Sequence, residues 1–190
     1  MLLLVGLGNP GSNYTNTRHN IGFKIIDAIN THFKLSKQKP KFKGLLTTGN
    51  IDEKKIYAIK PLTFMNNSGT AIKELIDYFK IDAKDVFVFH DDMDIDFGKI
   101  KAKFGGSSAG HNGIESIDKF IGKDYSRVRI GIGHPKQKKK VNSHVLEDFK
   151  EDEEEKINEI TENIVKQLPT LIEKKIDLFS SKVNQDLNGI

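Results

Sequence analysis

Short apolar runs alternate along this chain with segments in which apolar residues recur at helical spacing. Residues 2–6 and 86–89 are nearly continuous apolar runs, as in strands buried on both faces. Residues 18–33 instead place Ile21, Ile25 and Ile29 on one face of a helix. The alternation of these two patterns predicts an α/β fold.

The remaining patterns complete a sheet with flanking helices. Further strands are expected at residues 41–50, 54–59, 98–104 and 127–132, and further helices at 71–79, at 112–121 and from about 151 onward. Pro169 should kink or interrupt the C-terminal helix. We predict a single domain over residues 1–190, with a twisted, mixed β-sheet flanked by α-helices and a C-terminal helical segment from about residue 151.

The composition fits a soluble domain that needs no covalent or metal cross-links. A chain of 190 residues can bury a substantial core, and the absence of cysteine excludes thiol catalysis, disulfides and zinc thiolates. Residues 1–5 are apolar but have no basic leader or cleavage site, and no segment reaches the roughly 20 apolar residues of a membrane span. We expect a cytoplasmic monomer that does not associate with membranes.

The charge is unevenly distributed. Residues 1–150 carry 25 Lys and Arg against 16 Asp and Glu, whereas residues 151–190 carry 5 against 10. Many of the basic residues gather between Lys99 and Lys140. This region could neutralise several phosphates, which makes nucleic acid a candidate partner; solvated surface lysines are the plainer explanation.

Clusters of polar residues beside the apolar stretches contain the candidate catalytic groups. His19 could serve as a general base, and Asp91 could hold its tautomer and favour its charged form. Asn9, Asn66 and Asn112 offer amides that could orient water and substrate. This set of side chains suits hydrolysis of an ester or amide without a metal ion.

Three other motifs suggest different chemistry. Residues 6–11 match G-x-G-x-x-G, but a polar loop follows where a dinucleotide-binding helix should begin. Residues 106–110 match the G-x-S-x-G elbow of serine hydrolases, which would leave the His19 and asparagine set unexplained. Residues 92–98 resemble a calcium loop, but the glycine comes one place late and Lys103 stands where the glutamate should be. We expect no cofactor and no metal site.

The other histidines have less specific surroundings. His32 lies late in a helix and looks structural. His90 precedes Asp91 at the end of a strand, so its ring should face the opposite side of the sheet. His111 and His134 follow glycines in loops, where we expect hydrogen bonds to the backbone.

Motifs along nearly the whole chain resemble those of bacterial peptidyl-tRNA hydrolases. The matching segments, to which Tyr14 is added, are VGLGNPG at 5–11, TRHNIG at 17–22, KPLTFMN at 60–66, SG at 68–69, HDD at 90–92, GHNG at 110–113 and RIGIGHP at 129–135. Seven segments in one order, with similar gaps and a similar total length, make chance agreement a poor explanation. The departures, in the loop at 106–110 and at Pro169, are modest.

The resemblance implies hydrolysis of the ester between a peptide and the terminal ribose of tRNA, which releases tRNA from prematurely dissociated peptidyl-tRNA. The family's catalytic histidine falls on His19, which would activate water, and its acid partner falls on Asp91. Its amides, which hold the peptide main chain, the terminal adenosine and the attacking water, fall on Asn9, Asn66 and Asn112. Asn9 and Asn112 would thereby join the catalytic group.

The same resemblance implies where the substrate lies. Tyr14, Phe64 and Met65 match positions near the cleft, beside Asn66 and Asn112. Contacts to phosphates of the tRNA acceptor arm are expected from five basic residues: Lys101, Lys103, Arg129, Lys136 and Lys138.

Two alternatives from other classes remain. A non-catalytic RNA-binding relative, similar to splicing factors of this fold, would bind RNA without cleaving an ester. A nucleotide-dependent oxidoreductase built on the glycine motif would be stabilised by a dinucleotide in a thermal melt.

Overall fold

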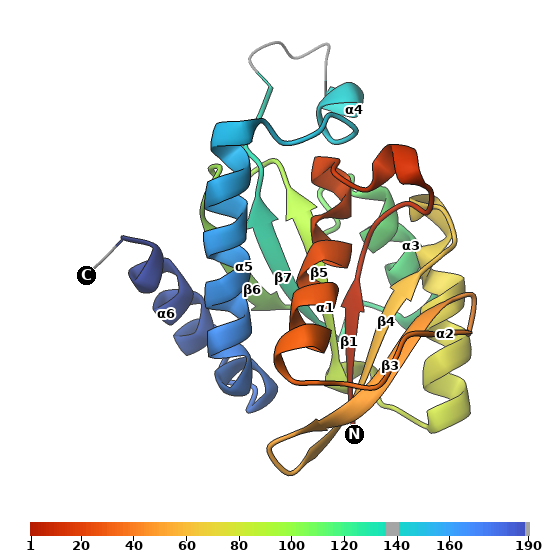
Figure 1. Cartoon of the computed structure of the whole chain (residues 1–190). Helices are drawn as coiled ribbons and strands as arrows, with labels where there is room; N and C mark the ends of the chain where they lie inside the picture. The colour runs from red at the N-terminus through yellow and green to blue at the C-terminus, as the bar shows by residue number, and fades with distance from the viewer. Residues whose placement is uncertain (136–140, 189–190) are drawn as a thin grey trace.

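The structure, a computed structural model, describes residues 1–135 and 141–188. Lys136 and Lys138, two of the predicted phosphate contacts, lie outside the described residues. The described chain forms a seven-stranded mixed sheet in the order β2-β3-β4-β1-β5-β7-β6, with helices packed on both faces (Figure 1). The predicted fold class is confirmed.

The centre of the sheet is parallel and its margins are antiparallel. Strands β4, β1, β5 and β7 run parallel, whereas β2, β3 and β6 pair antiparallel with their neighbours. Strands β1 and β5 are buried over their whole length, which explains their apolar sequences. The strands are β1 (Leu2–Gly6), β2 (Lys39–Lys41), β3 (Gly44–Ile51), β4 (Lys54–Pro61), β5 (Val86–Asp92), β6 (Ile100–Phe104) and β7 (Ser126–Gly131).

Alternate residues of the central strands face two apolar layers. Leu4 and Phe89 belong to the layer beneath α1, α5 and α6, whereas Leu3 and Val88 belong to the layer beneath α2 and α3.

Among the helices of the described residues, none combines the length and the apolar sequence that a membrane span requires. The α-helices are α1 (Ile21–His32), α2 (Ser68–Phe79), α3 (Asn112–Ile121), α4 (Val141–His144), α5 (Glu151–Ile172) and α6 (Ile176–Asn188).

Four 3-10 helices lie in the connections of the described chain. They are η1 (Ser12–Tyr14), η2 (Arg18–Asn20), η3 (Met65–Asn67) and η4 (Ala83–Asp85). Helix η2 leads directly into α1, and η3 leads directly into α2.

Helix α1 packs directly on the backbone of the sheet because Gly22 lies at the crossing. A Cβ on Gly22 would overlap the backbone nitrogen of Leu7 and the carbonyl oxygen of Phe89, and a Cβ on Gly6 would overlap Gly22. This close approach brings His19, in η2, next to the end of β5.

Side chains of α6 cover the free edge of β6. Asn184 Oδ1 accepts a hydrogen bond from the Ile100 N–H at 3.0 Å, and Asn184 Nδ2 donates to the Ile100 carbonyl at 2.9 Å. The Ala102 N–H donates to Ser180 Oγ at 2.8 Å. Backbone groups of an edge strand that are paired in this way are unavailable to a strand of another chain.

The structure changes several predicted boundaries. The helix expected at 18–33 starts with the tighter turn of η2, and the short strand β2 was not anticipated. A kink or an interruption was predicted at Pro169; the interruption is wrong, because α5 continues through Pro169 to Ile172. Leu168 and Leu171 on either side are fully buried, and this burial offsets the hydrogen bond that proline cannot donate.

Candidate active site

The candidate catalytic residues lie at or near the carboxyl ends of the parallel strands. Asn9 follows β1, Asp91 lies near the end of β5, and His19 comes from η2. His19 and Asp91 are 72 positions apart in the sequence and in direct contact in the fold. Ligand sites of open α/β sheets form at this edge.

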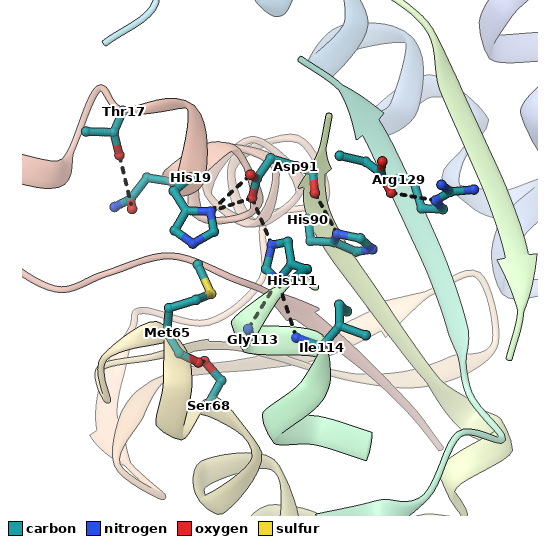
Figure 2. A network of polar contacts seen from close by, with 12 residues as sticks. Thr17, His19, Met65, Ser68, His90, Asp91, His111, Gly113, Ile114 and Arg129 are labelled. Carbon is teal, nitrogen blue, oxygen red and sulfur yellow. Dashed lines mark hydrogen bonds and ion pairs between the residues drawn. The ribbon is translucent and has the colours of Figure 1, made fainter. Parts of the chain in front are cut away.

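His19 and Asp91 form a buried pair (Figure 2). His19 Nδ1 lies 2.8 Å from Oδ1 and 3.0 Å from Oδ2 of Asp91. The His19 backbone N–H donates to the Val145 carbonyl at 2.8 Å, which helps to fix the histidine. Because an ionised carboxylate only accepts hydrogen bonds, Nδ1 carries the proton and Nε2 keeps a lone pair. This arrangement predisposes Nε2 to accept a proton.

The two groups change each other's acidity. Burial alone would lower the pKa of His19, but the charge of Asp91 and its hydrogen bond outweigh burial and raise this pKa above its ordinary value. Burial alone would raise the pKa of Asp91, but His19 and His111 together hold this pKa well below its usual range. Asp91 is therefore ionised at neutral pH, and His19 is a stronger base than a free histidine.

His111 is a third member of this group, which the sequence analysis missed. His111 Nε2 lies 3.0 Å from Oδ1 of Asp91, the same oxygen that His19 contacts. The predicted backbone contact is also present, because His111 Nδ1 accepts hydrogen bonds from the N–H groups of Gly113 and Ile114 at the start of α3. A histidine beside a helix start was the only signal of this role in the sequence.

His90 lies on the other side of the group, as predicted from strand alternation. Its Nδ1 donates to the Asp91 carbonyl at 2.7 Å, and its ring meets that of His111 edge-on, with centroids 4.8 Å apart. Burial, followed by the neighbouring His111, holds the pKa of His90 well below its ordinary value. His90 is therefore a neutral packing partner.

The side chains of His19, Asp91 and His111 lie close enough together to surround a cation. Ligand atoms of His19, Asp91 and His111 lie within 4.8 Å of one another, the one such group of His and acidic residues in the described chain. Both imidazoles, however, contact Asp91 at hydrogen-bond distances of 2.8 and 3.0 Å. A cation would have to displace two protons, so the present geometry fits an acid–base group better than a metal centre.

Asn9 is held by residues from two other segments. Its Oδ1 accepts a hydrogen bond from the Met65 N–H at 2.8 Å, which leaves the Nδ2 amide group to face a ligand. Asn20 bonds to both the N–H and the carbonyl of Asn9, each at 2.9 Å. Asn20 belongs to a predicted polar cluster, but its role as a support for Asn9 was not predicted.

The other candidate substrate residues differ in how exposed they are. Asn66 and Asn112 are exposed, Tyr14 is half-buried, and Phe64 is 59% exposed, which is unusual for phenylalanine. Met65 is only 4% exposed and packs in the layer beneath α2 and α3. Asn112 lines a cavity of about 100 Å³ together with His19, Asp91 and His111.

Comparison with known proteins places this chain in a family. The family described as peptidyl-tRNA hydrolase matches residues 3–189. The chain belongs to the peptidyl-tRNA hydrolase family. The resemblance seen in its motifs is thereby confirmed.

Individual peptidyl-tRNA hydrolases are similar over almost their full length. The protein of that name from Pelagibacter ubique (strain HTCC1062) is 72% identical over 97% of this chain and 99% of its own. That from Ehrlichia ruminantium (strain Welgevonden) is 46% identical over 95% and 93%. The crystal structure of peptidyl-tRNA hydrolase from Acinetobacter baumannii superposes with a TM-score of 0.91 at 34% identity, covering 97% of this chain and 94% of that one.

Four basic residues of this family member lie on the neighbouring strands β6 and β7. Lys101 and Lys103 pair in register with Arg129 and Arg127. Burial, and then the charges of Arg129 and Arg127, lower the pKa of Lys103. Arg129 Nε donates to Asp92 at 2.7 Å, and Arg127 is buried against Asp118.

The three competing motifs have local contacts that differ from those their alternative chemistry would require. After residues 6–11 the chain passes through the 3-10 helices η1 and η2 before α1, so no α-helix begins at the glycines. Ser108 Oγ donates to Glu115 at 3.2 Å rather than to a histidine. In the calcium-like loop, Asp92 pairs with Arg129, and Asp94 pairs with His134 at 2.9 Å.

Proposed function

We propose that His19 is the general base with which this chain hydrolyses peptidyl-tRNA. The reaction cleaves the ester bond between the peptide and the tRNA. One observation supports the assignment above all others: Asp91 contacts His19 at Nδ1, which leaves Nε2 free to take a proton from water. The ring borders a cavity of about 100 Å³ that can admit the attacking water.

In this mechanism, a water molecule attacks the ester carbonyl carbon while His19 Nε2 accepts its proton. Asp91 stabilises the imidazolium that forms. Amide N–H groups of Asn9 and Asn112 donate to the negative oxygen of the tetrahedral intermediate. The intermediate then collapses, and the ribose oxygen leaves with the proton carried by His19. No step needs a metal ion or a cofactor.

The surrounding residues suggest how the substrate is held. Asn66 and Asn112 present exposed amides to the peptide main chain and the terminal adenosine. Phe64, exposed beside them, offers a face on which a base or a peptide side chain can stack, and Tyr14 offers a second ring. Met65 contributes packing beneath them and the N–H that orients Asn9.

The tRNA acceptor arm would lie along β6 and β7. Lys101 is exposed and Lys103 is half-buried there, and Arg129 stands beside Lys101 in register. Two further lysines proposed for the same role, Lys136 and Lys138, lie outside the described residues. Such contacts recognise phosphates rather than bases, which suits an enzyme that accepts many tRNAs. We also propose that the whole chain acts as one domain and as a cytoplasmic monomer.

The decisive experiment compares two substrates in the presence of EDTA. N-acetylated aminoacyl-tRNA and the unblocked aminoacyl-tRNA are incubated with the wild type, with His19→Ala and with His32→Ala. Loss of a general base should slow turnover by about 100- to 10,000-fold with little change in tRNA affinity. His32, exposed at the end of α1, is the matched control and should leave the rate unchanged.

The outcomes separate the alternatives. Cleavage of only the blocked ester, lost in His19→Ala and kept in His32→Ala, supports the proposal. Full activity in His19→Ala would refute it, and activity of the wild type that EDTA removes would refute the metal-free mechanism. Tight tRNA binding by the wild type without cleavage would favour a non-catalytic RNA-binding protein.

A further inference from the structure

The geometry points to His111 as a positioning residue that limits how strongly Asp91 attracts the proton of His19. This inference rests on the proposed role of His19 as the general base. It begins with one oxygen atom: Oδ1 of Asp91 lies 2.8 Å from His19 Nδ1 and 3.0 Å from His111 Nε2. The two imidazoles therefore share one carboxylate oxygen, as Figure 2 shows.

The backbone of α3 sets the tautomer of His111. Its Nδ1 accepts the N–H groups of Gly113 at 3.1 Å and Ile114 at 3.3 Å, so this nitrogen carries a lone pair. The proton of the neutral ring must then lie on Nε2, where it points at Asp91. His111 thus links two N–H groups at the start of a helix to the catalytic carboxylate.

Packing holds the ring of His111 in this orientation. The ring of His90 meets it edge-on at 4.8 Å, and the ring of His19 is tilted against it at 4.9 Å. His90 is itself fixed by the hydrogen bond from its Nδ1 to the Asp91 carbonyl. Only 9% of the His111 side chain is exposed. His111 therefore has little freedom to turn away from Asp91.

A second donor on the shared oxygen changes how Asp91 acts on His19. A carboxylate that already accepts a hydrogen bond is a weaker acceptor for the next donor, and the His111 N–H also places a partial positive charge near His19. Both effects favour the neutral, catalytically competent form of His19. The amount of enzyme that is active near neutral pH then depends on His111.

Other charged or titratable groups surround the pair. Asp92 and Asp94 line the same cavity, and the ring of His90 packs against that of His111. Arg18, Glu115 and His144 belong to the neighbouring elements η2, α3 and α4. Arg18 pairs with Glu153, Asp92 with Arg129 and Asp94 with His134. His144 contacts the carbonyls of Ile132 and Gly133. Of the histidines, His111 alone shares Asp91 Oδ1 with His19 in the described chain.

The test is the variant His111→Asn in the full-length protein. Asparagine is a good helix N-cap, so its oxygen can replace Nδ1 at the start of α3, while its amide is too short to reach Asp91 as the imidazole does. Side-chain ¹H–¹⁵N NMR gives the pKa of His19 directly, and kcat/KM is measured against pH. We expect both the pKa of His19 and the acidic limb of the profile to rise by about one unit, a tenfold change in the ratio of protonated to neutral ring. The loss of kcat/KM should be larger on the acidic limb of the profile than on its alkaline plateau.

Three further variants sharpen the test. His111→Gln, with one more methylene, can place its amide N–H near Asp91 and should return the pKa of His19 toward the wild-type value. If His111→Asn does not fold, His111→Ser provides another short N-cap. His32→Asn, the same substitution at an exposed histidine, should leave the pKa of His19 unchanged.

The results distinguish this inference from the proposed function. An unchanged pKa of His19 in the short variants, or an equal loss of activity at every pH, would overturn the role of His111. If the pKa of His19 shifts while the acidic limb of the kcat/KM profile stays in place, His19 is not the general base. The coupling between His111 and His19 would then still hold.

Discussion

The side chain of Asn20 holds the backbone of Asn9 from both sides. Asn20 Oδ1 accepts the Asn9 N–H and Asn20 Nδ2 donates to the Asn9 carbonyl, each at 2.9 Å. Both residues are buried. Asn20 thus connects the loop after β1 to the 3-10 helix that carries His19, so one side chain sets the spacing between Asn9 and the proposed base.

Removal of this link should reduce both stability and catalysis. Asn20→Ala leaves two buried backbone groups of Asn9 without partners, which should lower the free energy of unfolding by about 1–3 kcal/mol. Urea denaturation and kcat/KM on N-acetylated aminoacyl-tRNA measure the two effects. Asn50→Ala, at an exposed position of β3, is the matched control. A variant with wild-type kcat/KM would show that Asn9 does not depend on Asn20.

The pH dependence should follow His19. Its pKa is raised above the ordinary 6.5, so the ring is protonated below this raised pKa and neutral above it. kcat/KM should therefore rise with pH through a value above 6.5. The same shift means that protonated His19 stabilises the fold at low pH and that this contribution disappears as the pH rises through the folded pKa. An acidic limb below 6.5 would contradict the assignment.

Asp91→Asn should move this limb in the opposite direction. Without the negative charge, burial is left to lower the pKa of His19, and the amide can present an N–H to Nδ1 and favour the wrong tautomer. We expect the acidic limb to move to lower pH while the plateau falls by about 10³- to 10⁴-fold. Kinetics over a pH series and NMR of the imidazole measure the two effects. A limb that stays in place would show that Asp91 does not control the base.

Lys103 should act on tRNA affinity rather than on chemistry. Burial, and then the charges of the neighbouring Arg129 and Arg127, lower the pKa of Lys103, so a phosphate group would relieve repulsion among the three basic residues. Lys103→Ala should weaken tRNA binding and reduce the slope of log K against log salt by about 1. The exposed Lys37 provides the control Lys37→Ala. Binding and salt slope that equal the wild type would exclude Lys103 from the phosphate contacts.

The contact between α6 and the edge of β6 should protect the protein from aggregation. Asn184→Ala leaves the N–H and carbonyl of Ile100 without their partner, with an expected loss of about 1–3 kcal/mol in the free energy of unfolding. The variant should also aggregate faster below its Tm, because the strand edge can then pair with another chain. Light scattering on heating tests this, with Gln185→Ala on the exposed side of α6 as the control. Equal aggregation of the two variants would contradict the protective role.

Local patterns predicted most elements because each reflects burial at its own position. The apolar runs correctly identified the central strands β1 and β5, and the helical spacing correctly identified α1, which packs on them. The interruption predicted at Pro169 was wrong because local propensity reflects only the hydrogen bond that proline cannot donate. In the folded chain the burial of Leu168 and Leu171 also stabilises the helix. Strand β2 escaped notice because its three residues are exposed and have no apolar pattern.

The fold class and the family could be predicted from the sequence alone, because periodicity and ordered motifs are properties of neighbouring residues. The sequence also named His19 and Asp91 as candidates from their chemistry. The contact between the two, and the approach of His111 to the same oxygen of Asp91, could be found only in the folded chain. These contacts depend on α1 lying against the sheet backbone at Gly22 and on the start of α3 facing the end of β5. Hydrogen bonds require atoms within about 3 Å, and only the packed chain sets distances of that kind.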